Sequence, residues 1–258
     1  MPNRPVTFSI ITCTWNNAAT LPDTLASLRA QTCTDVEHIF VDAGSNDGTL
    51  DLLAAFDGNK RVLHDVRGGI SRAMNCGIDA ARGTIVAHLH ADDYYAAPDV
   101  LANVAAAMAH SRREWLVGEI AVLDGAQLMP AQPPRAYSYH ALATGRAYVP
   151  HPATFVRRSV FEQVGRFDEQ LRYAMDIDLW LRLAALTPPA ILHSVLAVFR
   201  DHPGSVSSAN KLLARQEEWR VRRRYAGAAP FAFLIYCLRY LKRTHVLRRK
   251  MLATSSVR

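Results

Sequence analysis

Short apolar runs alternate with helical periodicity along the first half of the chain. The apolar runs predict strands at 6–12, 36–41, 61–64 and 84–90, and the periodic segments predict helices at 20–31, 49–56, 70–81 and 98–111. Thr20 is the expected N-cap of the first helix. Strands that alternate with helices predict a parallel sheet with helices on both faces, so we expect an α/β fold.

The second half of the chain is less regular. The pattern weakens between 116 and 150. Helices are predicted at 158–164 and 176–186, followed by a helical pair at 211–225 and 231–249 that Pro230 separates. We therefore expect an α/β domain over 1–208 and a basic helical segment over 209–258.

The positive charge is concentrated at the C-terminal end. The 258 residues have a formal net charge of +7, but 220–258 contains eleven Lys and Arg residues and no Asp or Glu, which leaves the rest at about −4. The apolar stretch 226–238 lies between basic clusters. This pattern is typical of a helix at an anionic membrane surface; the alternative is a helix that packs on the domain with a solvated basic face. No recognition motif accompanies the charge, so we expect no nucleic-acid partner.

The cysteines and the apolar runs suggest the compartment. Cys13, Cys33, Cys76 and Cys237 have no CxxC spacing, which favours neither a zinc cluster nor a disulfide framework. The first strand begins without the pattern of a signal peptide, and no apolar run is long enough to span a bilayer. We therefore expect a cytoplasmic protein whose membrane contact, if present, is peripheral to the inner face of the cell membrane.

Two adjacent carboxylates, Asp92 and Asp93, follow the strand expected at 84–90. Ligands of open α/β sheets bind at the carboxyl ends of the strands. Two acids at such a position fit a divalent cation that faces a phosphorylated ligand. The alternative is a solvated loop or a helix N-terminus, where Asp is also common.

A second acid, Asp42, ends the strand expected at 36–41 and precedes a turn rich in Gly, Ser and Asn. Its carboxylate could accept hydrogen bonds from a nucleoside, or the segment could be an ordinary βα turn. The first βα turn has no GxGxxG and the chain has no GxxxxGK[ST], which weakens dehydrogenase and ATPase interpretations.

Seven segments, in order, carry a family resemblance. They are Ser9–Asn17, Val41–Thr49, Gly68–Gly77, Ala91–Tyr94, His151–Phe155, Val164–Asp168 and Met175–Arg182. Together they resemble the successive motifs of glycosyltransferase family 2, over roughly residues 6 to 205. The resemblance implies a GT-A fold with a mostly parallel nucleotide-binding sheet, a nucleotide-diphosphate sugar donor, a divalent metal and inversion at the anomeric carbon.

The resemblance also assigns the donor site. It implies that Asp93 binds Mn²⁺ or Mg²⁺ and that Asp92 contacts the ribose or shares the metal. Asp42 matches the acid that contacts the base. Further expected contacts of the nucleotide or diphosphate are Thr12, Thr14, Trp15, Arg72 and Asp47.

An inverting transfer needs a base that takes the proton of the acceptor hydroxyl. The resemblance places this base at Asp176, with Asp178 as the near alternative. Asp176 also fits a helix N-terminus, where it would only stabilise the helix. Trp180 follows and could stack on a sugar or belong to the core.

Three histidines remain candidates. His90 stands where related sequences often carry Asn or Asp; it could bind metal, point into the sheet or bond a neighbour. His151 opens a segment that related proteins use near the acceptor and donor sugar, or it is structural. The resemblance also places His202 in a loop, 201–207, that closes over the diphosphate.

The sequence therefore predicts an inverting glycosyltransferase that moves a sugar from a nucleotide-diphosphate donor to a glycan or lipid-linked hydroxyl acceptor. We expect a role in cell-surface polysaccharide or lipid-linked glycan synthesis. The alternative is a catalytically inactive protein of the same fold that binds sugar nucleotides, for which His90 is the sequence indication.

Overall fold

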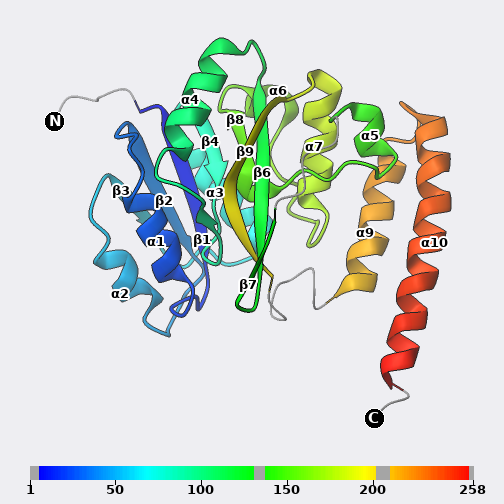
Figure 1. Ribbon diagram of the computed structural model, residues 1–258, viewed down its shortest axis with the longest axis horizontal. Coiled ribbons are helices and arrows are strands. Elements are labelled where there is room, and N and C mark those ends of the chain that lie inside the picture. The colour runs from blue at the N-terminus through cyan, green and yellow to red at the C-terminus, as the bar shows by residue number, and fades with distance from the viewer. Residues whose placement is uncertain (1–5, 131–136, 202–209, 256–258) are drawn as a thin grey trace.

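The computed structural model describes residues 6–130, 137–201 and 210–255 (Figure 1). In these residues a mixed nine-stranded sheet has the order β3-β2-β1-β4-β8-β6-β9-β5, with β7 paired to β6. The strands are β1 (Phe8–Thr14), β2 (Val36–Asp42), β3 (Lys60–Leu63), β4 (Ile85–His88), β5 (Tyr94–Tyr95), β6 (Trp115–Asp124), β7 (Gln127–Met129), β8 (Thr154–Arg157) and β9 (Ala190–Asp201).

Helices cover both faces of this sheet (Figure 1). They are α1 (Leu21–Arg29), α2 (Thr49–Ala54), α3 (Ile70–Ala80), α4 (Val100–His110), α5 (Tyr139–Ala143), α6 (Val160–Val164), α7 (Met175–Leu186), α9 (Lys211–Arg224) and α10 (Pro230–Ser255), with a 3₁₀ turn η1 (His151–Ala153). The α/β class is confirmed, and the helices expected from periodicity are present with shifted ends.

The parallel arrangement is confirmed for β3-β2-β1-β4 and changes beyond β4. There β8 is antiparallel to both β4 and β6, β9 is parallel to β6, and β5 is antiparallel to β9. The long strands β6 and β9 were not expected from the sequence. The β6–β9 register is irregular around Gly118, where a Cβ would collide with Leu196. Glycine at this position lets β9 approach β6 and also obscures the strand pattern.

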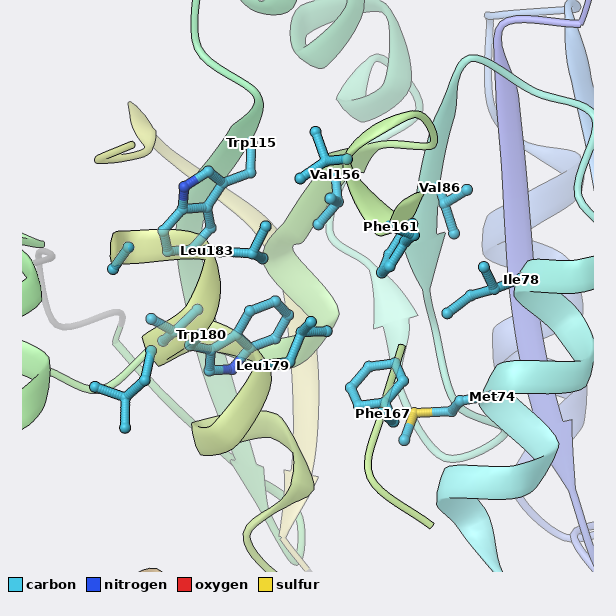
Figure 2. Close-up of a cluster of buried hydrophobic side chains, with 14 of the residues drawn as sticks. Met74, Ile78, Val86, Trp115, Val156, Phe161, Phe167, Leu179, Trp180 and Leu183 are labelled. Atoms are coloured by element: carbon cyan, nitrogen blue, oxygen red, sulfur yellow. The ribbon is translucent and has the colours of Figure 1, made fainter. Parts of the chain in front are cut away.

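Each face of the sheet has its own hydrophobic core. One core joins α1, α2 and α4 to the sheet, and the other joins α3, α6 and α7 to the opposite face. In the second core Trp115 of β6 stacks on Trp180 of α7 with ring centroids 5.9 Å apart, and Figure 2 shows Phe167 beside Met74 of α3. Trp180 is therefore a core residue, and its suggested role in stacking on a sugar is not supported by its position.

The C-terminal helices pack on this second core. Val221 of α9 and Ala232 of α10 are buried in it. Arg222 is buried too; it pairs with Glu218 at 3.0 Å, donates to the Leu142 carbonyl and lies over the Tyr236 ring at 4.7 Å. These contacts tie α9 to α5 and α10. The domain boundary at residue 208 stays a prediction, but α9 shares its core with α7.

A buried carboxylate stabilises the edge of the sheet where β2 begins. Glu37 accepts hydrogen bonds from Ser9 Oγ at 2.6 Å and from the Arg82 amide at 2.6 Å, and it pairs with Arg82 and Arg61. Burial raises the pKa of Glu37, but these hydrogen bonds and the Arg82 charge outweigh burial and hold the pKa below its usual value.

Replacing Glu37 by Gln should lower the free energy of unfolding by about 1–3 kcal/mol at pH 7, because the variant loses charge-assisted bonds inside the fold. The difference should shrink as the pH falls through the folded pKa, since the wild-type carboxylate is then protonated. Urea unfolding at several pH values measures this. Asp57→Asn, at an exposed acid, is the control; an equal loss there would contradict the assignment.

Candidate active site

The loop that carries the acidic pair is fixed by α1. Thr20 Oγ1 donates to the Ala91 carbonyl at 2.8 Å, and Thr24 Oγ1 donates to the Asp93 carbonyl at 2.7 Å. Thr20 occupies the N-cap position of α1, as expected, but its side chain makes no capping bond. Its hydroxyl is used instead to hold the loop that contains Asp92.

Arg200, near the end of β9, holds the same loop from the other side. Its amide donates to Asp93 Oδ1 at 3.1 Å, and its Nε donates to the Asp92 carbonyl at 3.2 Å. Its guanidinium also pairs with Asp23 of α1 at 2.5 Å. The sequence analysis missed Arg200. The only signal was its position just before the loop 201–207; that loop and His202 lie outside the described residues, apart from Asp201.

The Asp93 carboxylate lies in an unfavourable electrostatic environment. Its side chain is buried, and burial followed by the neighbouring Asp92 charge raises its pKa well above the usual value, against the amide and charge of Arg200. A cation would relieve both effects. Among the described residues no three His, Cys, Asp or Glu side chains converge on a metal position. One or two carboxylates suffice for Mg²⁺ when phosphate and water oxygens complete the shell, so the acidic pair fits this group.

The end of β2 is organised around Asp42. Oδ1 accepts from the amides of Gly44 and Ser45 at 2.8 and 2.9 Å, and Oδ2 accepts from the hydroxyls of Thr14 and Ser45 at 2.9 and 2.5 Å. Burial raises the pKa of Asp42, but these bonds outweigh burial and lower it overall. Asp42 therefore shapes its turn, and its contact with a base stays a prediction.

The other predicted nucleotide contacts lie in different environments. Trp15 follows β1 and is 65% exposed, Arg72 is exposed in the first turn of α3, and Thr12 is fully buried in β1. Asp47 accepts from the Ala18 amide at 2.9 Å and from the Thr49 hydroxyl at 2.6 Å, so it joins the β1 and β2 loops. The strands β1, β2 and β4 are parallel neighbours, so their carboxyl ends lie on the same side of the sheet. Trp15, Asp42 and the acidic pair therefore lie on that side.

Asp176 lies in the first turn of α7. Its Oδ1 accepts from the Ile177 amide at 2.7 Å. Burial raises its pKa to about 6, with a further contribution from Glu218, while the Ile177 amide and Arg222 act in the opposite direction. A carboxylate with this pKa is able to accept a proton near neutral pH.

Asp178, the alternative base, is a structural residue. Its Oδ2 accepts from Arg182 at 2.8 Å, and its Oδ1 accepts from the Tyr225 hydroxyl at 2.7 Å. Arg182 also donates hydrogen bonds to the carbonyls of Val164 and Arg166. Asp178 therefore joins α7 to α9 and to the loop after α6, and these bonds occupy both its oxygens.

The segment 165–174, which leads into α7, is anchored on two sides. From α3, Asn75 bonds both the amide and the carbonyl of Phe167, and Ser71 Oγ donates to the Leu171 carbonyl. From α9, Glu217 accepts from three successive amides, those of residues 172, 173 and 174. These anchors are not recognisable from local sequence, because their partners lie 43 or more residues away.

Tyr148 links the two acidic positions. The residue as a whole is 66% exposed, but desolvation of its hydroxyl raises the pKa of Tyr148, and the carboxylates of Asp176 and Asp93 raise it further. Both carboxylates therefore act on the same phenol. The candidate cation ligand and the candidate base therefore both lie within electrostatic range of Tyr148, which sequence reasoning did not single out.

Three imidazoles cluster together, of which His88 is buried and His90 and His151 are half-buried. The rings of His88 and His90 each lie 5.3 Å from the ring of His151. Burial lowers the pKa of all three, to about 3 for His88, so they are neutral. His90 turns toward His151 inside the protein, which supports the interpretation that it points into the sheet.

Comparison with known proteins identifies the family. The sequence model described as "Glycosyl transferase family 2" matches residues 9–165. The chain belongs to glycosyltransferase family 2. A family 2 relative, a "PGL/p-HBAD biosynthesis glycosyltransferase" of Mycobacterium bovis (strain BCG / Pasteur 1173P2), is 34% identical over 206 residues, 76% of this chain and 78% of the relative. An uncharacterised glycosyltransferase of Mycobacterium tuberculosis (strain CDC 1551 / Oshkosh) is 30% identical over 201 residues, 75% of this chain and 74% of that protein.

Solved structures confirm the GT-A fold expected for family 2. S. aureus TarS 1–349 in complex with UDP-GlcNAc matches with a TM-score of 0.72 and 20% identity, over 86% of this chain and 66% of that one. The mannosyltransferase PcManGT from Pyrobaculum calidifontis, in complex with GDP-Man and Mn²⁺, matches with a TM-score of 0.63 and 17% identity, over 99% of this chain and 81% of that one.

The Glu217 anchor is testable without an activity assay. Glu217→Gln should accelerate hydrogen exchange of the Tyr173 and Ala174 amides at least about tenfold, because charge-assisted bonds contribute about 1.5–3 kcal/mol. Exchange measured by NMR reports this residue by residue. Glu162→Gln on α6, an exposed position, is the matched control; unchanged protection in Glu217→Gln would show that the carboxylate does not order the segment.

Proposed function

We propose that this family 2 protein is an inverting, metal-dependent glycosyltransferase. It moves a sugar from a nucleotide-diphosphate donor to a hydroxyl acceptor in cell-surface polysaccharide or lipid-linked glycan synthesis. The observation that carries the proposal is the buried Asp93 carboxylate, in a loop that Thr24 and Arg200 fix, together with the Asp176 carboxylate in the first turn of α7, whose pKa is raised to about 6.

The acidic pair serves the leaving group. Transfer releases a nucleoside diphosphate, whose negative charge must be neutralised as the glycosidic bond breaks. Asp93 would hold Mn²⁺ or Mg²⁺, with Asp92 on the metal or the ribose, and the bound cation would supply this neutralisation. Arg200 and Thr24 fix the loop before the donor arrives, so the ligands need little reorganisation.

The nucleoside lies along the ends of β1 and β2 in this proposal. The exposed Trp15 ring stacks on the base. The turn after β2, which Asp42 stabilises through its bond from Thr14, lies beside the base. Arg72 faces the diphosphate from the first turn of α3. TarS with UDP-GlcNAc and PcManGT with GDP-Man support a nucleotide-sugar donor of this class, and the Mn²⁺ in the PcManGT complex supports the metal.

Asp176 is the base of the reaction. It takes the proton of the acceptor hydroxyl as the hydroxyl oxygen attacks the anomeric carbon from the face opposite the diphosphate, which inverts the configuration. Its raised pKa suits this task near neutral pH. The relatives named for PGL/p-HBAD biosynthesis support a glycolipid or glycan acceptor.

His90 favours one alternative, a protein of this fold that binds sugar nucleotides without turnover, since related sequences often have Asn or Asp at this position. Calorimetry with a nucleoside diphosphate and Mn²⁺, followed by a donor-hydrolysis assay, separates the two. Binding without hydrolysis or transfer would favour the alternative. A metal-dependent thermal-shift screen of nucleotide sugars would then identify the donor.

Asp93→Asn should raise the melting temperature of the metal-free protein, because the variant removes a buried charge whose raised pKa makes it destabilising at neutral pH. The same variant should lose the thermal shift that Mn²⁺ with a nucleoside diphosphate produces in the wild type. Differential scanning fluorimetry measures both effects. A full ligand-induced shift in Asp93→Asn would rule out the metal assignment.

Asp176→Asn should lower kcat by about 10²–10⁴-fold and leave donor binding intact, because it removes only proton abstraction. In the wild type, kcat/KM should fall as the pH drops through about 6, where the Asp176 carboxylate is protonated. Steady-state kinetics from pH 5 to pH 8 tests both. Wild-type rates in Asp176→Asn would assign the base elsewhere; Asp57→Asn is the control.

A further inference from the structure

One side of α10 presents an uncovered row of large apolar residues. Phe231, Leu234, Leu238 and Leu241 are 80%, 59%, 64% and 63% exposed. Their spacing of i, i+3, i+7 and i+10 places them on one face of the helix. We call these four residues the α10 stripe. Single exposed apolar side chains are ordinary, but a continuous row marks an interaction surface.

The stripe is not needed to attach α10 to the protein. A different face of the helix, with Ala232 and Tyr236, is buried. Tyr236 lies against Arg222, and Tyr240 and Phe233 contact the Trp219 ring of α9. Figure 1 shows α10 at the outer edge of the molecule, antiparallel to α9 and longer than it. The stripe therefore remains available to a partner.

The charges around the stripe indicate the partner. At about 100° per residue, Lys242 and Arg249 fall on one flank of the stripe and Arg248 on the other. All three side chains are exposed. From 219 to 258 the sequence has no Asp or Glu. A second copy of the chain would offer no acidic group on this helix to match these cations, whereas an anionic lipid surface matches both the apolar row and the charge.

We propose that α10 lies on an anionic bilayer, with the α10 stripe inserted among the acyl chains and Lys242, Arg248 and Arg249 at the lipid phosphates. No helix within the described residues has the length and hydropathy to cross a membrane, so contact through this helix is at the surface. The two interpretations of the basic tail are then both correct, because one face of α10 packs on the protein and another faces lipid.

Docking through α10 would also orient the active site. α10 packs on α9, and α9 supplies Glu217 to the segment that leads to Asp176. The active site is thereby joined to the bilayer through two packed helices. The acceptor would then be a lipid-linked hydroxyl presented at the membrane; this last step rests on the proposed function, whereas the docking does not.

Vesicle sedimentation of the full chain tests the docking. Wild type should bind phosphatidylcholine vesicles that contain phosphatidylglycerol at least about tenfold more tightly than vesicles of phosphatidylcholine alone, because each basic residue near an anionic surface contributes about fivefold in affinity. The double variant Leu234→Ser/Leu238→Ser should lose binding. Lys242→Glu/Arg249→Glu should lose the preference for anionic vesicles.

Matched controls separate docking from loss of structure. Leu213→Ser on α9 and Leu128→Ser on β7 change exposed apolar residues outside the stripe and should bind as wild type does. Circular dichroism should show unchanged helix content in all variants. Equal binding by the stripe variant, or no preference for anionic vesicles in wild type, would overturn the proposal. So would a wild-type dimer in vesicle-free solution that the stripe variant converts to monomer.

An activity assay distinguishes the membrane-docking proposal from the proposed function. The stripe variant should retain donor hydrolysis in solution and lose transfer only to an acceptor embedded in anionic vesicles. Vesicle binding by a wild type that neither hydrolyses nor transfers would leave the docking standing and remove the proposed function. Equal transfer to embedded acceptors by wild type and the stripe variant would remove the docking instead.

Discussion

The active site depends on one electrostatic constraint, the placement of the Asp93 carboxylate beside Asp92 in a buried loop. Folding buries the Asp93 carboxylate next to the half-buried Asp92, and burial followed by the Asp92 charge raises the pKa of Asp93. The loop withstands this because Thr20, Thr24 and Arg200 bond its backbone and one carboxylate oxygen. The buried carboxylate thus lowers the stability of the fold, and a bound cation and diphosphate would offset that loss.

A second constraint concerns the segment before α7. The chain from 165 to 174 has no regular structure of its own, yet it must deliver Asp176 to the edge of the sheet where Asp93 lies. Ser71 and Asn75 of α3 hold it from one side and Glu217 of α9 from the other. The C-terminal helices therefore support the segment that leads to the candidate base Asp176, and α10 is joined to that segment through α9.

Much of the first half of the fold could be predicted from the sequence. Short apolar runs and one clear helical stripe determine β1 to β4 and α1 to α3, because local periodicity reports burial on a sheet or on one helix face. The acidic pair and Asp42 were also recognisable, since ligands of open α/β sheets bind at the carboxyl ends of the strands. The strands β6 and β9 were missed because Gly118 and Glu119 interrupt the apolar run of β6, and His193 and Ser194 interrupt that of β9.

The sequence by itself determined three features of this protein. These are the charged residues at the ends of strands and helices, the family 2 motifs, and the basic–apolar–basic pattern of the C-terminal segment. Only the tertiary structure decided how those groups are used. It placed Asp178 in a bond with Tyr225, raised the pKa of Asp176, set the His90 ring beside His151, and showed which face of α10 is uncovered. The reason is physical: desolvation, hydrogen-bond saturation and exposure depend on neighbours from distant parts of the chain, and local sequence contains no record of them.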